Sequence, residues 1–188
     1  EEEQREQTKK RNKLLYQSEH DELTGLYNKR SLNRYLEDVF EACKLNEKEL
    51  GILFLDIDYF KQLNDRYGHG KGDKGICAVA DTLKKIFPED YVARYGGDEF
   101  LVVMTGRDLT YVMEHAESLC AGIREYKIPN EDSELEPWLT ISVGGVCAIP
   151  REPNRVWDFL SAADNTLYEQ KKEQKGKVRF YQGEGKYL

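Results

Sequence analysis

The sequence has no apolar run approaching the roughly 18 residues that cross a membrane as a helix, and it has no signal peptide. It also has no excess of basic residues, because 28 Lys and Arg stand against 35 Asp and Glu, a formal net charge of −7. This balance argues against a nucleic-acid or anionic-membrane surface, which would need a basic footprint. Any phosphate ligand must therefore be bound by local groups.

Cysteine is scarce, and no two cysteines have the spacing of a metal-binding or redox pair. The four stand singly within apolar patterns, so we expect buried, reduced thiols rather than disulfides or a zinc site; they are Cys43, Cys77, Cys120 and Cys147. This usage is typical of a cytoplasmic protein, or of the cytoplasmic part of a larger, membrane-anchored one. Because the chain begins with Glu1 rather than Met, we expect a fragment of a longer protein.

The most informative stretch is Tyr91 to Thr105, YVARYGGDEFLVVMT, in which two apolar runs flank Gly-Gly-Asp-Glu. The pattern predicts a tight β-hairpin whose glycines supply positive φ values and let a ligand approach the backbone. Two carboxylates, Asp98 and Glu99, stand at its tip, and a second pair, Asp56 and Asp58, ends the apolar run GILFL. If the two strand ends are neighbours, the carboxylates must bind a cation or become protonated. Mg²⁺ with a nucleotide is the natural occupant.

Apolar periodicity predicts a mixed α/β domain. Helices alternate with strands of a mixed sheet, an order typical of an α/β sandwich with a split βαβ (ferredoxin-like) core. Ser31 and Asp58 are the expected caps of two of the helices, and Gly144 with Gly145 indicates a bulge or a close approach within a strand. The expected helices cover 31–43, 59–67, 74–87, 109–123 and 156–167, and the expected strands 51–57, 91–95, 100–104, 139–149 and 178–181.

Residues 1–18 form an N-terminal segment that is rich in charge and helix formers but has no apolar stripe. Two interpretations stay open: a solvated, frayed helix, or the end of a signalling helix that enters from an upstream sensor domain. In either case Leu14, Leu15 and Tyr16 would anchor its end on the domain, which we place at residues 19–188.

Four motifs, in the right order and spacing, resemble those of the GGDEF-domain diguanylate cyclases, and the resemblance covers residues 21 to about 177. They are DELTGLYNKR from Asp21, LDIDYFKQLND from Leu55, YGHGKGD from Tyr67 and GGDEF from Gly96. Such a set is far more specific than a lone glycine motif. The resemblance implies a fold similar to that of adenylyl cyclases and polymerase palm domains. It also implies a nucleotidyltransferase of bacterial signalling that condenses two GTP molecules into cyclic di-GMP and releases two pyrophosphates.

The resemblance gives each acidic residue a role. Asp56 and the main-chain carbonyl of Ile57 would bind the metal ion, and Asp98 and Glu99 would complete the site from the hairpin. Mg²⁺ is the expected ion, with Mn²⁺ as an alternative. Asp98 would be both ligand and catalytic base, although a metal-lowered pKa of the hydroxyl could make a discrete base unnecessary. Seen alone, Asp56 and Asp58 would be ordinary strand-end and cap carboxylates.

The same resemblance assigns the substrate-binding residues. Tyr59, Phe60 and Lys61 begin a helix whose N–H groups, with the lysine, would hold the β and γ phosphates. Asn64 and Asp73 match the guanine-binding positions, where a carboxylate can accept from the N1 and N2 hydrogens.

Three further matches have plain alternatives. His69 would line the nucleotide pocket, although a satisfied loop histidine is the default interpretation. Lys171 matches a second phosphate-binding lysine. The basic residue expected after it is displaced by about two positions here, and Lys175 is the better match, with a favourable helix-dipole contact as the alternative.

One departure from the family pattern concerns product feedback. Many relatives carry R-x-x-D before the signature, a surface site where product binds and inhibits. This chain has Phe87-Pro88-Glu89-Asp90 there, without the arginine fork that binds guanine and phosphate. A cyclic di-GMP receptor acting through that site is therefore disfavoured. A catalytically silent GTP-binding or interaction module is the remaining alternative to an active cyclase.

The product itself predicts the assembly. Cyclic di-GMP joins two GMP units through two equivalent bonds, so catalysis calls for two domains that face each other about a twofold axis. The short polar N-terminal helix is too poor in apolar residues to hold such a dimer strongly. We therefore expect a transient homodimer, GTP as substrate, and neither nucleic acid nor membrane contact by this fragment.

Overall fold

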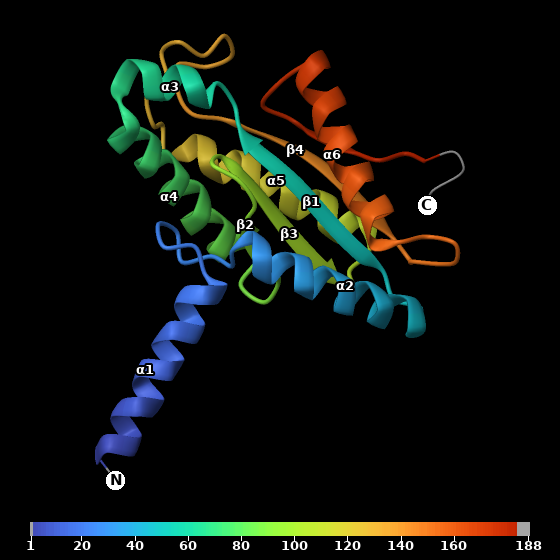
Figure 1. Ribbon diagram of the computed structural model, residues 1–188. Coiled ribbons are helices and arrows are strands. Elements are labelled where there is room, and N and C mark those ends of the chain that lie inside the picture. The colour runs from blue at the N-terminus through green and yellow to red at the C-terminus, as the bar shows by residue number, and fades with distance from the viewer. Residues whose placement is uncertain (1, 184–188) are drawn as a thin grey trace.

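The computed structural model describes residues 2–183, and Figure 1 shows a central sheet with helices on both of its faces. Five strands lie in the order β2-β3-β1-β4-β5. Only the β4–β5 pair is parallel among the strands of this described part, so the sheet is mixed, as predicted. The strands are β1 (Leu50–Ile57), β2 (Tyr91–Arg94), β3 (Glu99–Thr105), β4 (Ile141–Ala148) and β5 (Val178–Phe180).

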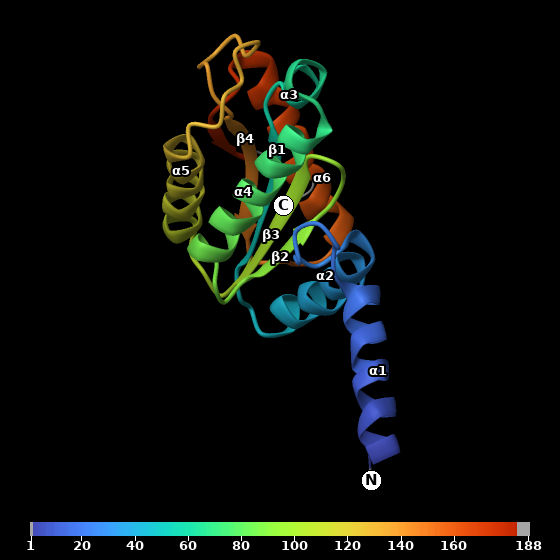
Figure 2. The ribbon, with the colours of Figure 1, turned by 90° about the vertical axis from the view of Figure 1, so that its left-hand side faces the viewer.

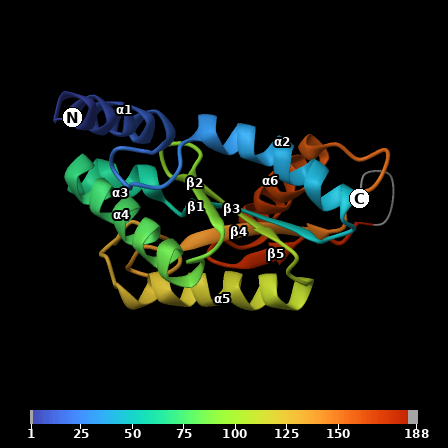
Figure 3. The same ribbon diagram turned by 90° about the horizontal axis from the view of Figure 1, so that it is seen from below.

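The helices form two layers around the sheet. In Figure 3, α2 and α6 lie on one side of the strands and α4 and α5 on the other. Helix α3 is short and stands at the end of β1 (Figure 1). The helices are α1 (Glu2–Glu19), α2 (Lys29–Leu45), α3 (Phe60–Tyr67), α4 (His69–Ile86), α5 (Leu109–Glu125) and α6 (Val156–Glu173).

Strand β1 is the middle strand of the sheet, and it is buried on both faces. This burial explains why its sequence is an apolar run. Leu53 and Leu55 belong to the core cluster under α4 and α5, whereas Ile52 and Phe54 belong to the cluster under α2 and α6. Fully burying each such side chain stabilises the fold by about 1.5–3 kcal/mol. The acidic end of β1 is therefore fixed by packing on either side.

Helix α1 extends away from the sheet, as Figures 1 and 2 show. It has no buried residue, and Leu14 and Leu15 are 57% and 52% exposed, so the prediction that they anchor it was wrong. The helix leaves the domain, so more than half of each of these side chains is exposed. Tyr16, the third predicted anchor, does make contact: its ring stacks on His20 at 4.0 Å, and His20 stacks on Tyr27 at 4.5 Å, between centroids.

Both predicted caps also differ from the structure. Asn28 caps α2 by accepting from the Ser31 N–H at 3.0 Å, and Ser31 lies inside the helix with its hydroxyl donating to the Glu19 carbonyl at 2.9 Å. Helix α3 has no side-chain cap, because Tyr59 takes that position in the left-handed conformation (φ 53°). Asp58 turns inward toward β4 instead.

Two general expectations can be compared with the structure directly. All four cysteines are free thiols; Cys43 and Cys120 are buried, whereas Cys77 and Cys147 are only half-buried. Within residues 2–183, none of the helices combines the length and the apolar character that a membrane span requires.

Candidate active site

The end of β1 and the start of β3 meet at one end of the sheet. Asp56 lies directly across from Glu99 in the antiparallel register, and the Ile57 N–H donates to the Asp98 carbonyl oxygen at 3.2 Å. Directly opposed residues of such a pair have Cβ atoms about 5 Å apart. The prediction that the two acidic strand ends are neighbours is therefore confirmed.

The turn between β2 and β3 is built differently from the prediction. Gly96 and Gly97 are not among the positive-φ glycines of the described chain, so the expected left-handed backbone was wrong. Gly96 is needed for space, because a Cβ there would lie 2.3 Å from the Glu99 Oε2 atom. A Cβ on Gly97 would meet no atom within 4 Å, so the tip is open to a ligand.

Arg94, the last residue of β2, stabilises this turn through hydrogen bonds to its main-chain carbonyl groups. Its guanidinium donates to the carbonyl oxygens of Gly97 at 2.7 Å and Gly96 at 3.1 Å, and it pairs with Asp21 at 3.2 Å. Although burial acts to raise the pKa of Asp21, hydrogen bonds from Thr24 and the charge of Arg94 lower it on balance. The segment that follows α1 is thereby tied to the acidic turn, a contact that the sequence analysis missed.

Asp56 has an unusual environment for a carboxylate. It is 8% exposed; its Oδ2 pairs with Lys171 Nζ, and its Oδ1 is buried with no hydrogen-bond partner among the described residues. The pKa of Asp56 is raised to about 6: burial is the largest cause, Lys171 opposes it, and the charges of Asp58 and Asp98 add to it. Leaving such an oxygen unmatched costs about 1–3 kcal/mol. That cost is typical of a functional site rather than of a structural one.

Asp98 and Glu99 share this electrostatic character. Burial raises the pKa of both, and the Asp98 charge raises that of Glu99 further. Across residues 2–183, no three Asp, Glu, His or Cys side chains converge into a complete metal cage. Mg²⁺ does not require one, because it usually binds a couple of carboxylates and fills its shell with phosphate oxygens and water. The unpartnered Asp56 Oδ1 opposite Glu99 fits an open site of this kind.

The predicted phosphate-binding segment lies at the start of α3. The first bond of this helix runs from the Leu63 N–H to the Tyr59 carbonyl at 3.0 Å, so Phe60 and Lys61 have N–H groups without a partner inside the helix. Lys61 is exposed. Lys175 arrives from beyond the end of α6, with its Nζ 5.1 Å from the Tyr59 ring centroid. The structure thus brings Lys175 next to this helix start.

The predicted guanine-binding residues lie where α3 meets α4. Asn64 Oδ1 is buried and has no hydrogen-bond partner within residues 2–183, and a Cβ on Gly72 would lie only 1.8 Å from it. Asp73 follows in the next position and is exposed, as is His69 at the first residue of α4. The structure therefore joins Asn64 closely to α4 and leaves Asp73 and His69 on the surface. Gly72 was missed, although a glycine inside a helical pattern is a sign of close approach.

The segment that replaces R-x-x-D is partly internal. Phe87 is 1% exposed and its ring lies 5.9 Å from the His115 ring between centroids. Asp90 is half-buried, and burial raises its pKa. A buried phenyl ring cannot replace the exposed arginine guanidinium that the family pattern has at this position.

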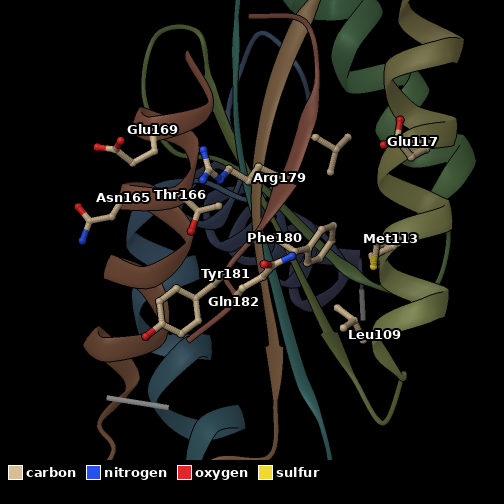
Figure 4. A pocket seen from close by; sticks show the side chains of 11 residues that line it. Leu109, Met113, Glu117, Asn165, Thr166, Glu169, Arg179, Phe180, Tyr181 and Gln182 are labelled. Atoms are coloured by element: carbon tan, nitrogen blue, oxygen red, sulfur yellow. The ribbon is translucent and has the colours of Figure 1, made fainter. Parts of the chain in front are cut away.

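A cavity of about 700 Å³ lies elsewhere, over β5 between α5 and α6 (Figure 4). Leu109, Met113 and Phe180 line it, and it contains none of the predicted site residues. This cavity and the predicted site residues therefore lie in different parts of the molecule. Three carboxylates with raised pKa values, Asp56, Asp98 and Glu99, and the unmatched Asp56 Oδ1 lie together at the strand ends, so the candidate active site is placed there.

Several known proteins are similar to this chain in sequence. A family model described as "Diguanylate cyclase, GGDEF domain" matches residues 18–177. The probable diguanylate cyclase DgcC of Escherichia coli strain K12 is 31% identical over 162 residues, 85% of this chain and 42% of that protein. A Staphylococcus saprophyticus protein named uncharacterized membrane protein SSP1970 is 31% identical over 163 residues, 85% of this chain and 45% of that protein. The chain spans less than half the length of these relatives.

Solved structures share the fold. The coiled coil and GGDEF domain of DgcB from Caulobacter crescentus, in complex with c-di-GMP, has a TM-score of 0.85 at 22% identity and covers 95% of this chain and 93% of its own. The diguanylate cyclase SiaD from Pseudomonas aeruginosa, in complex with its activator SiaC, has a TM-score of 0.75 at 27% identity, over 95% of this chain and 68% of that one. The fold is therefore that of the GGDEF domains, as the sequence predicts.

Proposed function

This chain belongs to the diguanylate cyclase GGDEF-domain family, and from that membership we propose that it is an active diguanylate cyclase that converts two GTP molecules into cyclic di-GMP and two pyrophosphates. One observation carries the proposal: the buried Asp56 stands opposite Glu99 with an oxygen that no other described group satisfies. A catalytically silent module would gain nothing from a buried carboxylate oxygen that lacks a hydrogen-bond partner. In an active enzyme, the metal ion that binds with the nucleotide would satisfy this oxygen.

The chain's own residues divide the remaining work. The N–H groups at the start of α3, with Lys61 and Lys175, would bind the β and γ phosphates. Lys171 neutralises Asp56 in the nucleotide-free domain and has a phosphate as its alternative partner. Asn64 and Asp73 would bind the guanine edge. Mg²⁺, or Mn²⁺, would neutralise phosphate charge and acidify the hydroxyl; its ligands would be Asp56, the Ile57 carbonyl, Asp98 and Glu99.

The reaction balances as two identical transfers. In each, the 3′-oxygen of one GTP forms a bond to the α-phosphorus of the other, the bond from that phosphorus to pyrophosphate breaks, and the hydroxyl proton passes to Asp98 or to water. One chain holds one such site, so two domains must face each other.

This facing arrangement predicts a concentration dependence. The specific activity of the chain should rise with enzyme concentration, because only the dimer can turn over, and a coiled coil fused before α1 should raise it at high dilution. The measurement is initial rate against enzyme concentration at saturating GTP, with sedimentation at the same dilutions. Strict proportionality where sedimentation finds only monomer would contradict the facing dimer.

Guanine selectivity should depend on Asn64 and on the space beside it. Asn64→Ala removes a partner for the base, and Gly72→Ala should do nearly the same, because its Cβ would displace the Asn64 amide. Losing such a partner should narrow the preference for GTP over ATP by about tenfold or more. Competition binding of the two nucleotides measures the effect.

Gly70→Ala is the matched control for this prediction. It lies on the same helix, and a Cβ there would meet no atom within 4 Å. We expect unchanged selectivity in this variant. Equal preference changes in Gly70→Ala and Gly72→Ala would move the guanine pocket away from Asn64.

Product feedback should act only through the active site. With Phe87 buried in place of the family arginine, cyclic di-GMP has no separate charged fork to bind. Calorimetry should therefore find no tight product binding once the site is filled with a GTP analogue that carries a non-cleavable α,β-methylene bridge. Persistent binding with the site filled would overturn this expectation.

The direct test of the proposed function is incubation with GTP and Mg²⁺, followed by identification of the nucleotide products. Cyclic di-GMP with two equivalents of pyrophosphate is the expected result. GTP binding without any product, at concentrations where the dimer forms, would favour the silent module instead. Because the matched region is less than half the length of these relatives, we further propose that the domain works under an upstream sensor in a longer protein.

A further inference from the structure

Asp58 does not cap α3, and its side chain belongs to a buried hydrogen-bond network instead. It is 1% exposed, and its carboxylate accepts hydrogen bonds from Thr140 Oγ1 at 2.8 Å and Ser142 Oγ at 2.6 Å. Its N–H donates to the Thr140 carbonyl at 2.9 Å. Thr140 and Ser142 are themselves 1% and 0% exposed. A buried carboxylate thus joins the end of β1 to the start of β4.

The Ser142 hydroxyl extends this network to the turn after α6. It has a single hydrogen, which it donates to Asp58, so its lone pairs face the Gly176 N–H, which donates at 2.9 Å. The Gly176 carbonyl accepts from Arg124 Nη2 at 2.5 Å. Gly176 has φ +77°, a conformation that favours glycine. Both polar backbone groups of this one residue are therefore fixed.

Fixing Gly176 has a consequence for the lysine before it. Lys175 precedes Gly176 in the chain, and its Nζ stands 5.1 Å from the Tyr59 ring centroid, at the start of α3. Tyr59 in turn follows Asp58. The network therefore connects Lys175 with the start of α3, the two parts of the predicted phosphate site, through the buried carboxylate of Asp58.

We propose, on the basis of the proposed function, that Asp58 and Ser142 are positioning residues that hold Lys175 at the phosphate end of the site. Lys175 and Lys177 both flank the fixed glycine, and Lys175 is the one whose Nζ lies against Tyr59 at the start of α3. The Asp58 carboxylate orders the Ser142 hydroxyl, and the hydroxyl orders the turn. The ligand class is a nucleoside triphosphate, recognised through its β and γ phosphates rather than its base.

Two hydroxyl donors to the same carboxylate provide a matched pair of variants. Ser142→Ala and Thr140→Val each remove one hydrogen bond to Asp58, but only Ser142 also bonds Gly176. A purely structural role predicts similar effects from both. A positioning role predicts that only Ser142→Ala weakens phosphate binding, and that it has no added effect in a Lys175→Ala background.

The measurement is calorimetric binding of the α,β-methylene analogue of GTP, compared with GMP, which lacks the β and γ phosphates. Ser142→Ala should weaken binding of the analogue about tenfold, as expected for a lost charge-assisted contact, and should leave GMP binding unchanged. Thr140→Val should change neither. In steady state, Ser142→Ala should raise KM for GTP more than it lowers kcat. Equal losses in the two variants, or equal losses for GMP and the analogue, would overturn the proposal.

Failure of this inference is separable from failure of the proposed function. The binding comparison needs no turnover. It therefore tests the inference even if the wild-type chain forms no cyclic di-GMP. Hydrogen exchange at the Gly176 amide gives a readout without nucleotide, and exchange should accelerate in Ser142→Ala but not in Thr140→Val. Unchanged protection in Ser142→Ala would contradict the network whether or not the chain is a cyclase.

Discussion

Replacing Asp56 by Asn should lower the rate of cyclic di-GMP formation at least about a hundredfold, the scale of losing one essential charge at a phosphoryl-transfer site. The substitution keeps nearly the same shape, so the loss falls on chemistry rather than on packing. Asp98→Asn should act in the same way, because Asp98 faces the same cluster from the turn between β2 and β3. Product formation at saturating GTP and Mg²⁺ measures both variants.

The fold should survive this change. Burial raises the pKa of Asp56 to about 6 from an ordinary 3.8, so folding favours the protonated acid. The stability contributed by that proton is complete below about pH 4 and is lost as the pH rises through 6. At pH 7 in chelator, Asp56→Asn should therefore unfold at a urea concentration equal to or above that of the wild type. Lys171 loses its partner in this variant, but its side chain is 30% exposed and can be hydrated.

Asp81→Asn is the matched control, since it makes the same chemical change on the exposed face of α4. It should alter neither turnover nor unfolding. Near wild-type turnover in Asp56→Asn or Asp98→Asn would remove the strand-end cluster from the mechanism. A hundredfold loss accompanied by unfolding would assign Asp56 to structure instead.

Much of this site was predictable because its parts are local in the sequence. The apolar run before Asp56 is a buried central strand, and the runs around Gly96 form the hairpin that pairs with it. Once a continuous strand and a hairpin share a sheet, their acidic ends have few alternatives to lying side by side. The short periodicities of strand and helix carried this information.

The errors arose where contacts between distant segments override local propensity. Asp58 looks like a helix cap, yet its partners lie just before β4 and within it, 82 and 84 residues away. Ser31 looks like a cap too, but Asn28 takes the position once the chain enters α2 from the His20–Tyr27 bridge. Nothing in a single sequence distinguishes a cap carboxylate from one that reaches a distant strand.

The glycines were located correctly, and the predicted cause was wrong at Gly96 but included the right one at Gly144. The turn at Gly96 requires space for the Glu99 side chain rather than a positive φ value. At Gly144 the alternatives were a bulge and a close approach, and the register of β4 with β1 runs unbroken through this residue, so the close approach holds. The sequence marks where side chains are excluded, and only packing tells what excludes them.

That close approach yields the second large expected effect. A Cβ on Gly144 would lie 2.3 Å from the Leu167 nitrogen and 2.4 Å from the Ala163 carbonyl oxygen, both in the backbone of α6. A side chain could rotate away, but a helix backbone must move as a whole. Gly144→Ala should therefore destabilise the domain by about 2–4 kcal/mol, at the upper end of overpacking effects, which urea unfolding would measure.

Two other glycines test whether backbone contact is the cause. On Gly145 a Cβ would meet the Phe180 ring at 2.5 Å, a side chain that can shift, and on Gly70 it would meet no atom within 4 Å. The loss of stability should therefore be largest for Gly144→Ala and smaller for Gly145→Ala, whereas Gly70→Ala on a helix should be neutral or stabilising by up to about 1 kcal/mol. Equal unfolding midpoints for the Gly144 and Gly70 variants would refute this account.

The same substitution should also reach the active site, because α6 carries Lys171 one turn beyond Leu167. If α6 lifts from β4, Lys171 withdraws from Asp56, and the folded fraction of Gly144→Ala should bind the α,β-methylene analogue of GTP more weakly than wild type. Gly145→Ala, which displaces a ring rather than the helix, should keep its affinity. Measured at a temperature where both variants are folded, equal affinities would mean that α6 accommodates the methyl group without moving, and that the contact between Gly144 and α6 sets stability alone.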